Sequence, residues 1–384
     1  MVMSDITSGY NIARDIYFEL EYNDLCGFRQ DELESIIIDI VRECGYGDDK
    51  INEALGLAQT YYNGYVFAFD LPATPVSPVK KAERVYNPTL SLYFLEQFRK
   101  TCGFPREMLD VNLAVDDAKL EYIANLPRGQ QLLLELSQKD YKVVVSSLSK
   151  RFGIRDMLSD NSRDNAFLVS FLYFTGVLTL SGETDNLEVV LRVPNLVMQK
   201  LYVERIQRML LPEPDDRDNG KWAAKEVYKG DIEPLCDFVE NRYFRVFDNR
   251  DYITANELTV KTAFLTLLYN DIIYIMDSEQ EVDRRYADLT MIIRPDKRYG
   301  AVFDVLIEFK FVSLKDAGLS GDEAKKLSRE DLSQIPVMAR QLDDGIKQVT
   351  DYGRRLEQKY KNLRLKKFVV GSLGFDRLCY VAVA

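Results

Sequence analysis

The order of the secondary structure predicted after residue 232 constrains the fold more than any other feature. Hydrophobic periodicity predicts helices at 232–242 and 255–270, strands at 272–276, 286–293 and 301–311, a helix at 335–358, and strands at 367–371 and 378–383. Three successive strands followed by a helix and a further strand predict an αβββαβ core around one sheet. Because the first half of the chain is mainly helical in pattern, we expect a mixed α+β or α/β protein with several domains.

The strand predicted at 301–311 contains two charged residues in an otherwise apolar run. Side chains alternate along a strand, so Leu306, Glu308 and Lys310 share one face of AVFDVLIEFKF. Charges on a central strand are costly unless each is paired or binds an ion. Glu308 and Lys310 are therefore the first candidates for a functional site.

The preceding strand carries a single carboxylate, Asp288, within RYADLTMII. If the two strands are neighbours, Asp288 and Glu308 meet at one end of the sheet, and their hard oxygen atoms suit Mg²⁺ or Mn²⁺. A metal held by two carboxylates beside Lys310 can hydrolyse a phosphodiester bond without an imidazole. The chain has no histidine, which excludes serine and cysteine triads, histidine-ligated metal sites and histidine phosphotransfer.

The motif Ala287-Asp288 followed by Glu308-Phe309-Lys310, with Gln348 and Tyr352 spaced as Gln-x-x-x-Tyr, resembles the PD-(D/E)XK nuclease superfamily. The resemblance is to the branch fused to a divergent AAA-ATPase-like domain. It implies a restriction-endonuclease-like core and a Mg²⁺- or Mn²⁺-dependent nuclease acting on DNA, with RNA as the alternative and with endonuclease and exonuclease action both open. It also implies roles for individual residues: Asp288 and Glu308 as metal ligands, Lys310 as the catalytic cation, and Gln348 and Tyr352 as substrate-positioning groups.

Two further carboxylates are candidates for the same site. Glu257 begins the helix before the core, where such nucleases often carry a Glu near the metal, but a carboxylate in a first helical turn is equally explained by the helix dipole. Glu281 precedes the Asp288 strand and is either an outer ligand or an exposed loop acid.

Basic residues cluster after Gln348, in a chain whose net charge is −11. The segment DYGRRLEQKYKNLRLKK offers a path for nucleic acid, and its alternative is a solvated helix face. The candidate contacts to nucleic acid are Arg354, Arg355, Lys359, Lys361 and Arg364.

The N-terminal half contains the words YYNGY and VYNP, which resemble the later part of the AAA-ATPase-like domain. Asn87 and Pro88 in VYNP predict the start of a helix. No G-x-x-x-x-G-K-[ST] motif occurs, so we expect no ATP site and no ATP hydrolysis by this chain. We interpret residues 1–125 as a helical lid remnant, left either by true truncation or by a reading frame that begins upstream.

Residues 126–210 read as helices followed by a hairpin, which predicts a winged-helix-like segment. The hairpin tip SGETDN carries acidic and no basic residues, which favours a structural role or contact with a protein partner over contact with DNA. Residues 211–231 begin with LPEPDDRDNGK, which predicts a linker, and residues 232–384 form the predicted nuclease-like domain.

Five cysteines lie scattered without a C-x-x-C pair, which argues against a zinc ribbon or a disulfide framework and indicates a reducing compartment. The start of the chain lacks a signal-peptide pattern, and the most apolar run, 167–180, is shorter than the roughly 20 residues of a membrane helix. We therefore expect a soluble cytoplasmic protein without membrane contact. The alternative to an active nuclease is a catalytically silent relic that binds nucleic acid or protein.

Overall fold

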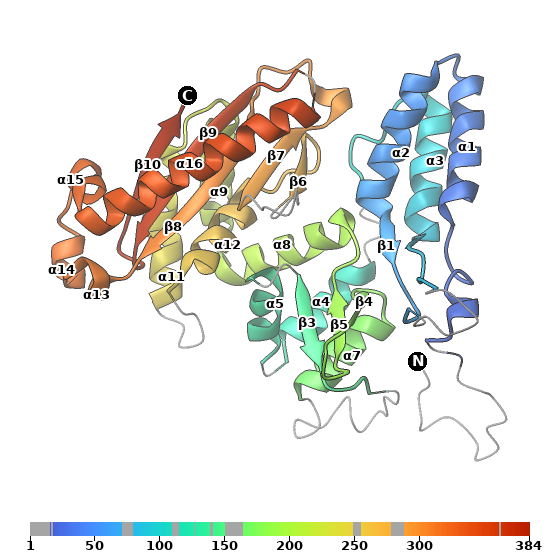
Figure 1. Cartoon of the computed structure of the whole chain (residues 1–384), viewed down its shortest axis with the longest axis horizontal. Helices are drawn as coiled ribbons and strands as arrows, with labels where there is room; N and C mark the ends of the chain where they lie inside the picture. The colour runs from blue at the N-terminus through green and yellow to red at the C-terminus, as the bar shows by residue number, and fades with distance from the viewer. Residues whose placement is uncertain are drawn as a thin grey trace. The chain divides into compact units, whose positions relative to one another are not determined.

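The computed structural model describes residues 16, 18–70, 80–109, 115–126, 128–138, 141–149, 164–248, 255–277, 288–360 and 362–384. The chain forms two compact units, Met1–Arg205 and Ile206–Ala384 (Figure 1). Each unit mixes helices with sheet, as the sequence predicts. No helix among these residues combines the length and the apolar character needed to cross a membrane.

Three helices make up the first part of unit 1: α1 (Gln30–Glu43), α2 (Asp48–Tyr62) and α3 (Pro88–Thr101). A short 3₁₀ turn (Leu20–Tyr22) precedes them, and β1 (Asn63–Tyr65) pairs with β2 (Val85–Tyr86) between α2 and α3. The predicted start of α3 is confirmed: the Asn87 side chain accepts a hydrogen bond of 3.1 Å from the Leu90 amide, and Pro88 occupies the first helical position.

A disulfide joins Cys44 at the end of α1 to Cys102 at the end of α3. The prediction that the chain has no disulfide is wrong for this pair, so cysteine usage no longer supports a reducing compartment. Cys26, Cys236 and Cys379 are free thiols. The two bonded residues lie 58 positions apart and are brought together only by helix packing, which no local spacing reveals.

The rest of unit 1 combines α4 (Val115–Ala124), α5 (Gly129–Gln138) and α7 (Asn165–Phe174) with a three-stranded sheet. The strands β3 (Lys142–Val145), β4 (Thr179–Glu183) and β5 (Val189–Arg192) are antiparallel in the order β3-β5-β4. The predicted hairpin is thus present as β4 and β5. Helix α8 (Leu196–Leu210) then carries the chain into the second unit.

The segment predicted as a linker is mostly helix α9 (Pro214–Tyr228). Pro214 takes the first helical position, and Asp215 and Asp216 complement the helix dipole in the first turn. The helix buries Ala223, Val227 and their neighbours. A polar first turn followed by small apolar residues was therefore misread as a linker, and that prediction is wrong.

Unit 2 is organised around a five-stranded sheet in the order β10-β9-β8-β7-β6. Its strands are β6 (Tyr274–Asp277), β7 (Leu289–Ile293), β8 (Asp304–Val312), β9 (Leu365–Leu373) and β10 (Arg377–Val383). All neighbours are antiparallel except β8 and β9, which are parallel and need a crossover. The crossover includes α16 (Pro336–Lys359), as the sequence predicts.

Helices cover both faces of this sheet. On one face α16 packs on the apolar side chains of β8 and β9, among them Leu306 and Val369, to form a hydrophobic core (Figure 1). On the other face Phe264 of α12 (Glu257–Leu268) contacts Phe309, with ring centroids 5.0 Å apart. The predicted alternation along β8 is confirmed, and Glu308 and Lys310 share the face of Leu306.

Shorter elements complete unit 2. Before α12 lie α10 (Glu233–Phe238), a π-helical turn (Val239–Tyr243) and α11 (Phe244–Asp248). A 3₁₀ turn (Pro295–Lys297) links β7 to β8, and three short helices follow β8: α13 (Leu314–Ala317), α14 (Gly321–Ala324) and α15 (Arg329–Gln334).

Candidate active site on the central strands of unit 2

Strands β7 and β8 bring Asp288 and Glu308 to corresponding positions. Leu289 pairs with Ile307, so the antiparallel register continued by one residue sets Asp288 opposite Glu308. An Asp288 carboxylate oxygen accepts a hydrogen bond of 2.7 Å from the Phe309 amide of β8. This backbone contact fixes the carboxylate beside the charged pair of the neighbouring strand.

Glu308 and Lys310 form a buried ion pair. The Lys310 Nζ donates to Glu308 Oε1 at 2.7 Å, and the two residues are 7% and 9% exposed. Gly345 of α16 lies over Lys310: a Cβ atom there would stand 3.4 Å from Lys310 Cε and 2.6 Å from a Val369 methyl group. The missing side chain lets the helix approach the sheet closely enough to cover the lysine stem.

Burial and the closeness of several carboxylates shift the pKa values of Glu308 and Lys310. The pKa of Glu308 is raised to about 7: burial raises it most, the negative charge of Asp288 adds to this, the Lys310 ammonium opposes both, and Glu257 adds a smaller raising effect. Burial lowers the pKa of Lys310, but its hydrogen bond to Glu308 and the surrounding carboxylates outweigh burial and raise it. Lys310 thus stays charged.

Glu257 belongs to the same electrostatic group. It is the first residue of α12, whose N-cap Asn256 accepts a hydrogen bond of 2.9 Å from the Thr259 amide. Burial and then the charge of Asp288 raise the pKa of Glu257, whereas Lys310 and Lys261 lower it. Glu257 therefore occupies a first helical turn and is also affected by the charge of Asp288, and both explanations weighed for this residue stay open.

The donor set suits a hard divalent cation. Among the described residues no group of three or more Asp, Glu or Cys side chains is close enough to hold a metal. Mg²⁺ is commonly bound through one or two carboxylates with several waters retained. A cation between Asp288 and Glu308 would also relieve the repulsion that raises the Glu308 pKa.

Comparison with known proteins finds a family match for the segment that carries these residues. Residues 255–374 match the PD-(D/E)XK nuclease superfamily. The match covers Glu257, Asp288, Glu308 and Lys310, and it confirms the resemblance for this segment only. It gives no support to an AAA-ATPase-like first half. No curated protein and no solved structure matched the chain.

The two residues predicted to position a substrate, Gln348 and Tyr352, differ in their surroundings. Gln348 is exposed on α16, one turn after Gly345, whereas Tyr352 is 4% exposed and packs in the hydrophobic core beneath the helix. Tyr352 therefore contributes to packing, and a substrate contact by either residue stays a prediction. Glu281 lies outside the described residues.

The basic residues after Gln348 are distributed between solvent and structural contacts. Arg354 and Lys359 are exposed, while Arg355 pairs with Asp351 at 3.3 Å. Arg364 donates to the Arg298 carbonyl at 3.2 Å. It precedes β9 beside the start of β8, roughly 17 Å along the strand from Glu308 by the rise per residue. Lys361 lies outside the described residues.

Sequence reasoning missed Gly345, the residue that allows α16 to pack closely over Lys310. The available signal was a glycine in the middle of an amphipathic helix, where it costs stability unless close packing requires it. It also missed the Arg298–Asp304 pair at 3.1 Å, which is buried on the Asp304 side at the start of β8. Two arginines of unit 1, Arg84 and Arg192, were not singled out either.

Proposed function

We propose that this protein is a Mg²⁺- or Mn²⁺-dependent nuclease that hydrolyses DNA phosphodiester bonds at Asp288, Glu308 and Lys310. The observation that carries the proposal is the interacting set of the buried Glu308 and Lys310 with the half-buried Asp288, on neighbouring strands of the segment that matches the nuclease superfamily. A fold would gain little from burying a carboxylate and a lysine beside a second carboxylate without a ligand.

Each residue of the set has a distinct part in this proposal. Asp288, fixed by the Phe309 amide, and Glu308 would hold the cation. Such an ion, when bound, supplies Lewis-acid polarisation of the phosphate and charge neutralisation. Lys310 is held beside Glu308, and its ammonium orients the attacking water and stabilises the negative charge that develops on phosphate oxygens. Gln348 and Tyr352 position the substrate, and Glu257 tunes the charge of the site.

The surrounding parts fit this proposal as accessories. The sheet β3-β5-β4, whose hairpin of β4 and β5 follows α7, supports a winged-helix-like segment, and its acidic hairpin favours a protein partner over DNA. The exposed cations Arg354 and Lys359 extend from the site along α16 and would contact the nucleic-acid backbone. We also propose that residues 1–125 are a lid remnant and that this chain does not hydrolyse ATP.

A second candidate function is a catalytically silent nucleic-acid- or protein-binding relic. The observation in its favour is the direct Lys310–Glu308 ion pair, in which the ammonium already neutralises one of the two carboxylates. A scaffold of that kind would keep the pair for folding and would bind no cation.

Cleavage assays separate the two functions. Purified protein is incubated with linear, circular and single-stranded DNA and with RNA, in Mn²⁺, Mg²⁺ or EDTA. We expect cleavage that requires the metal and falls by about 100-fold or more in Lys310→Ala, since one preorganised charge is worth that much in comparable sites. Lys347→Ala, which removes an exposed lysine of α16, is the matched control.

Equal traces of cleavage in wild type and Lys310→Ala would identify a contaminant. The absence of cleavage in folded wild-type protein, with no heat of Mn²⁺ binding by titration calorimetry, would establish the relic instead.

A further inference from the structure

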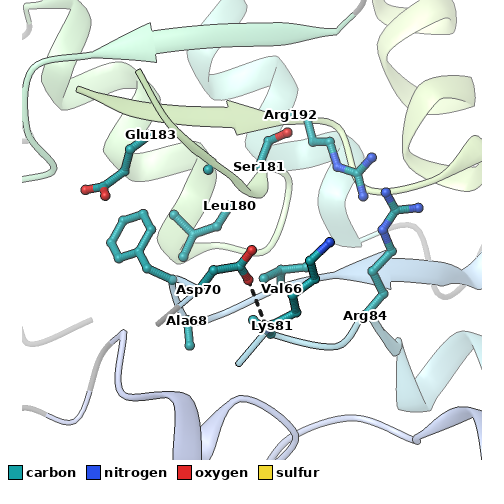
Figure 2. A pocket seen from close by; sticks show the side chains of 12 residues that line it. Val66, Ala68, Asp70, Lys81, Arg84, Leu180, Ser181, Glu183 and Arg192 are labelled. Carbon is teal, nitrogen blue, oxygen red and sulfur yellow. Dashed lines mark hydrogen bonds between the residues drawn. The ribbon is translucent and has the colours of Figure 1, made fainter. Parts of the chain in front are cut away.

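A pocket lies within unit 1, outside the segment that matches the nuclease superfamily. It has a volume of about 410 Å³, a size ordinary for small-molecule sites. Its walls come from the chain after β1, the chain before β2, and the strands β4 and β5 (Figure 2). Segments more than a hundred residues apart in sequence thus share one cavity.

Hydrogen bonds hold these walls together without a ligand. The Val66 amide donates to the Thr179 hydroxyl at 2.7 Å, and that hydroxyl donates to the Val66 carbonyl at 2.8 Å. On the other side, the Asp70 carboxylate accepts from the Ala82 amide at 2.8 Å. A pocket fixed in this way loses little conformational entropy when it is occupied.

Two guanidinium groups meet at one end of the pocket. Figure 2 shows Arg84 and Arg192 turned toward one another, with Lys81 on the same wall as Arg84. Among the described residues neither arginine forms an ion pair, and Arg192 Nε is buried without a hydrogen-bond partner. Burial, and after it the positive charge of Arg84, lower the pKa of Arg192 to about 10.

The turn YYNGY holds Arg192 in this position. Arg192 Nη2 donates to the Gly64 carbonyl at 3.4 Å. Gly64 has φ +128°, and a Cβ atom there would stand 2.0 Å from the Pro194 carbonyl oxygen, so only glycine fits. A motif that the nuclease does not use therefore shapes this pocket.

The unpaired cations call for an anion with more than one negative charge. Two adjacent guanidinium groups repel each other, and a phosphate monoester carries about −1.5 to −2 charges at neutral pH, whereas one carboxylate carries −1. Planar guanidinium groups also match phosphate oxygens in pairs. The remaining walls offer Phe69 and Leu180 for an apolar ring, and Asp70 and Glu183 as acceptors for hydroxyl or amino groups.

We propose that this pocket binds a nucleoside monophosphate group, with the phosphate between Arg84 and Arg192 and the base near Phe69. The group comes either from a free nucleotide or from the phosphorylated end of a nucleic-acid strand. Recognition rests on side chains, with no glycine-rich phosphate loop. It does not depend on the proposed nuclease site.

Titration calorimetry of the full chain in EDTA tests the pocket. The probes are AMP, adenosine, citrate, and a short single-stranded DNA with a 5′-phosphate or a 5′-hydroxyl. We expect AMP or the phosphorylated strand to bind at least tenfold more tightly than its unphosphorylated counterpart, and the preference between these two identifies the source. Arg84→Gln should weaken that binding by about 10- to 100-fold, the value of a charge-assisted contact.

Arg99→Gln, which removes an exposed arginine of α3, should leave this affinity unchanged, as should Asp288→Ala in the nuclease segment. Arg84 is exposed, so its variant reports on binding even where Arg192→Gln fails to fold. Equal affinity for AMP and adenosine together with equal affinity for the two strands, citrate binding as tightly as the phosphate, or unchanged affinity in Arg84→Gln would each overturn the proposal.

Discussion

Glu308 makes the stability of the metal-free protein depend on pH in a definite direction. Its pKa rises from about 4.5 to about 7 on folding because burial and the charge of Asp288 disfavour its ionised form. The folded state therefore holds a proton that the unfolded state has lost, and the free energy of unfolding falls as pH rises from about 4.5 to about 7. Above that window the contribution is constant.

Glu308→Gln should remove this part of the pH dependence. We measure the free energy of unfolding by urea in EDTA at pH 5 and at pH 7.5. Between these two pH values it should fall by roughly 1–3 kcal/mol more in wild type than in the variant. In the wild type the pKa of Lys310 is raised by its hydrogen bond to Glu308 and by the surrounding carboxylates, so Lys310 keeps its charge throughout this range. The exposed Glu330→Gln is the control, and parallel curves for wild type and Glu308→Gln would contradict the prediction.

Gly345 is the residue that should couple packing to the site. In Gly345→Ala the new Cβ atom meets a Val369 methyl group at 2.6 Å and Lys310 Cε at 3.4 Å, so we expect a loss of about 1–3 kcal/mol in unfolding free energy and slower DNA cleavage. The matched control is Gly353→Ala in the same helix. Its Cβ atom meets chiefly the flexible end of Lys367, at 2.9 Å.

Guanidinium unfolding and single-turnover cleavage would measure both effects. Gly353→Ala should change stability by less than about 1 kcal/mol, because the helix-forming advantage of alanine offsets a movable contact. If the two variants behave alike, Gly345 has no special role in covering Lys310.

At the scale of elements, the sequence specified the nuclease segment better than the rest. The strands β6 to β10 and the helices α12 and α16 lie within a few residues of their predicted bounds, since alternating or helical apolar patterns are strong in each. Helix α9 was not predicted, because the polar composition of its first turn is also typical of a linker. From the sequence, Glu308 and Lys310 could be predicted only to share a face of the strand. Their direct contact depends on side-chain rotamers, which the packing of α16 sets.

The bundle of α1, α2 and α3 should depend on its disulfide. Cys44 and Cys102 close a loop of 58 residues, for which the loss of chain entropy in the unfolded state predicts stabilisation of up to about 4 kcal/mol. Reductant should lower the unfolding midpoint seen by near-ultraviolet circular dichroism of the tyrosine-rich bundle. The double variant Cys44→Ser/Cys102→Ser should start lower and not respond to reductant. An unchanged midpoint in wild type would show that the bridge contributes nothing to stability.

At the scale of the whole molecule, the two compact units carry separate sites. Asp288 and Glu308 lie in Ile206–Ala384, and the arginine-lined pocket lies in Met1–Arg205. A ligand stabilises only the cooperative unit that binds it in its folded form. Mn²⁺ and a nucleotide phosphate should therefore act on different unfolding transitions.

Calorimetry with Mn²⁺ at about 100 times its dissociation constant should raise the transition of unit 2 by roughly 5–10 °C, the shift that about 2.7 kcal/mol produces in a domain of this size. Trp222, the single tryptophan, lies in unit 2 and identifies that transition by fluorescence. Asp288→Ala should abolish the shift and leave unit 1 unaffected. Because a metal bound elsewhere would still stabilise Asp288→Ala, a shift that persists in this variant would remove Asp288 from the metal site and with it the proposed chemistry.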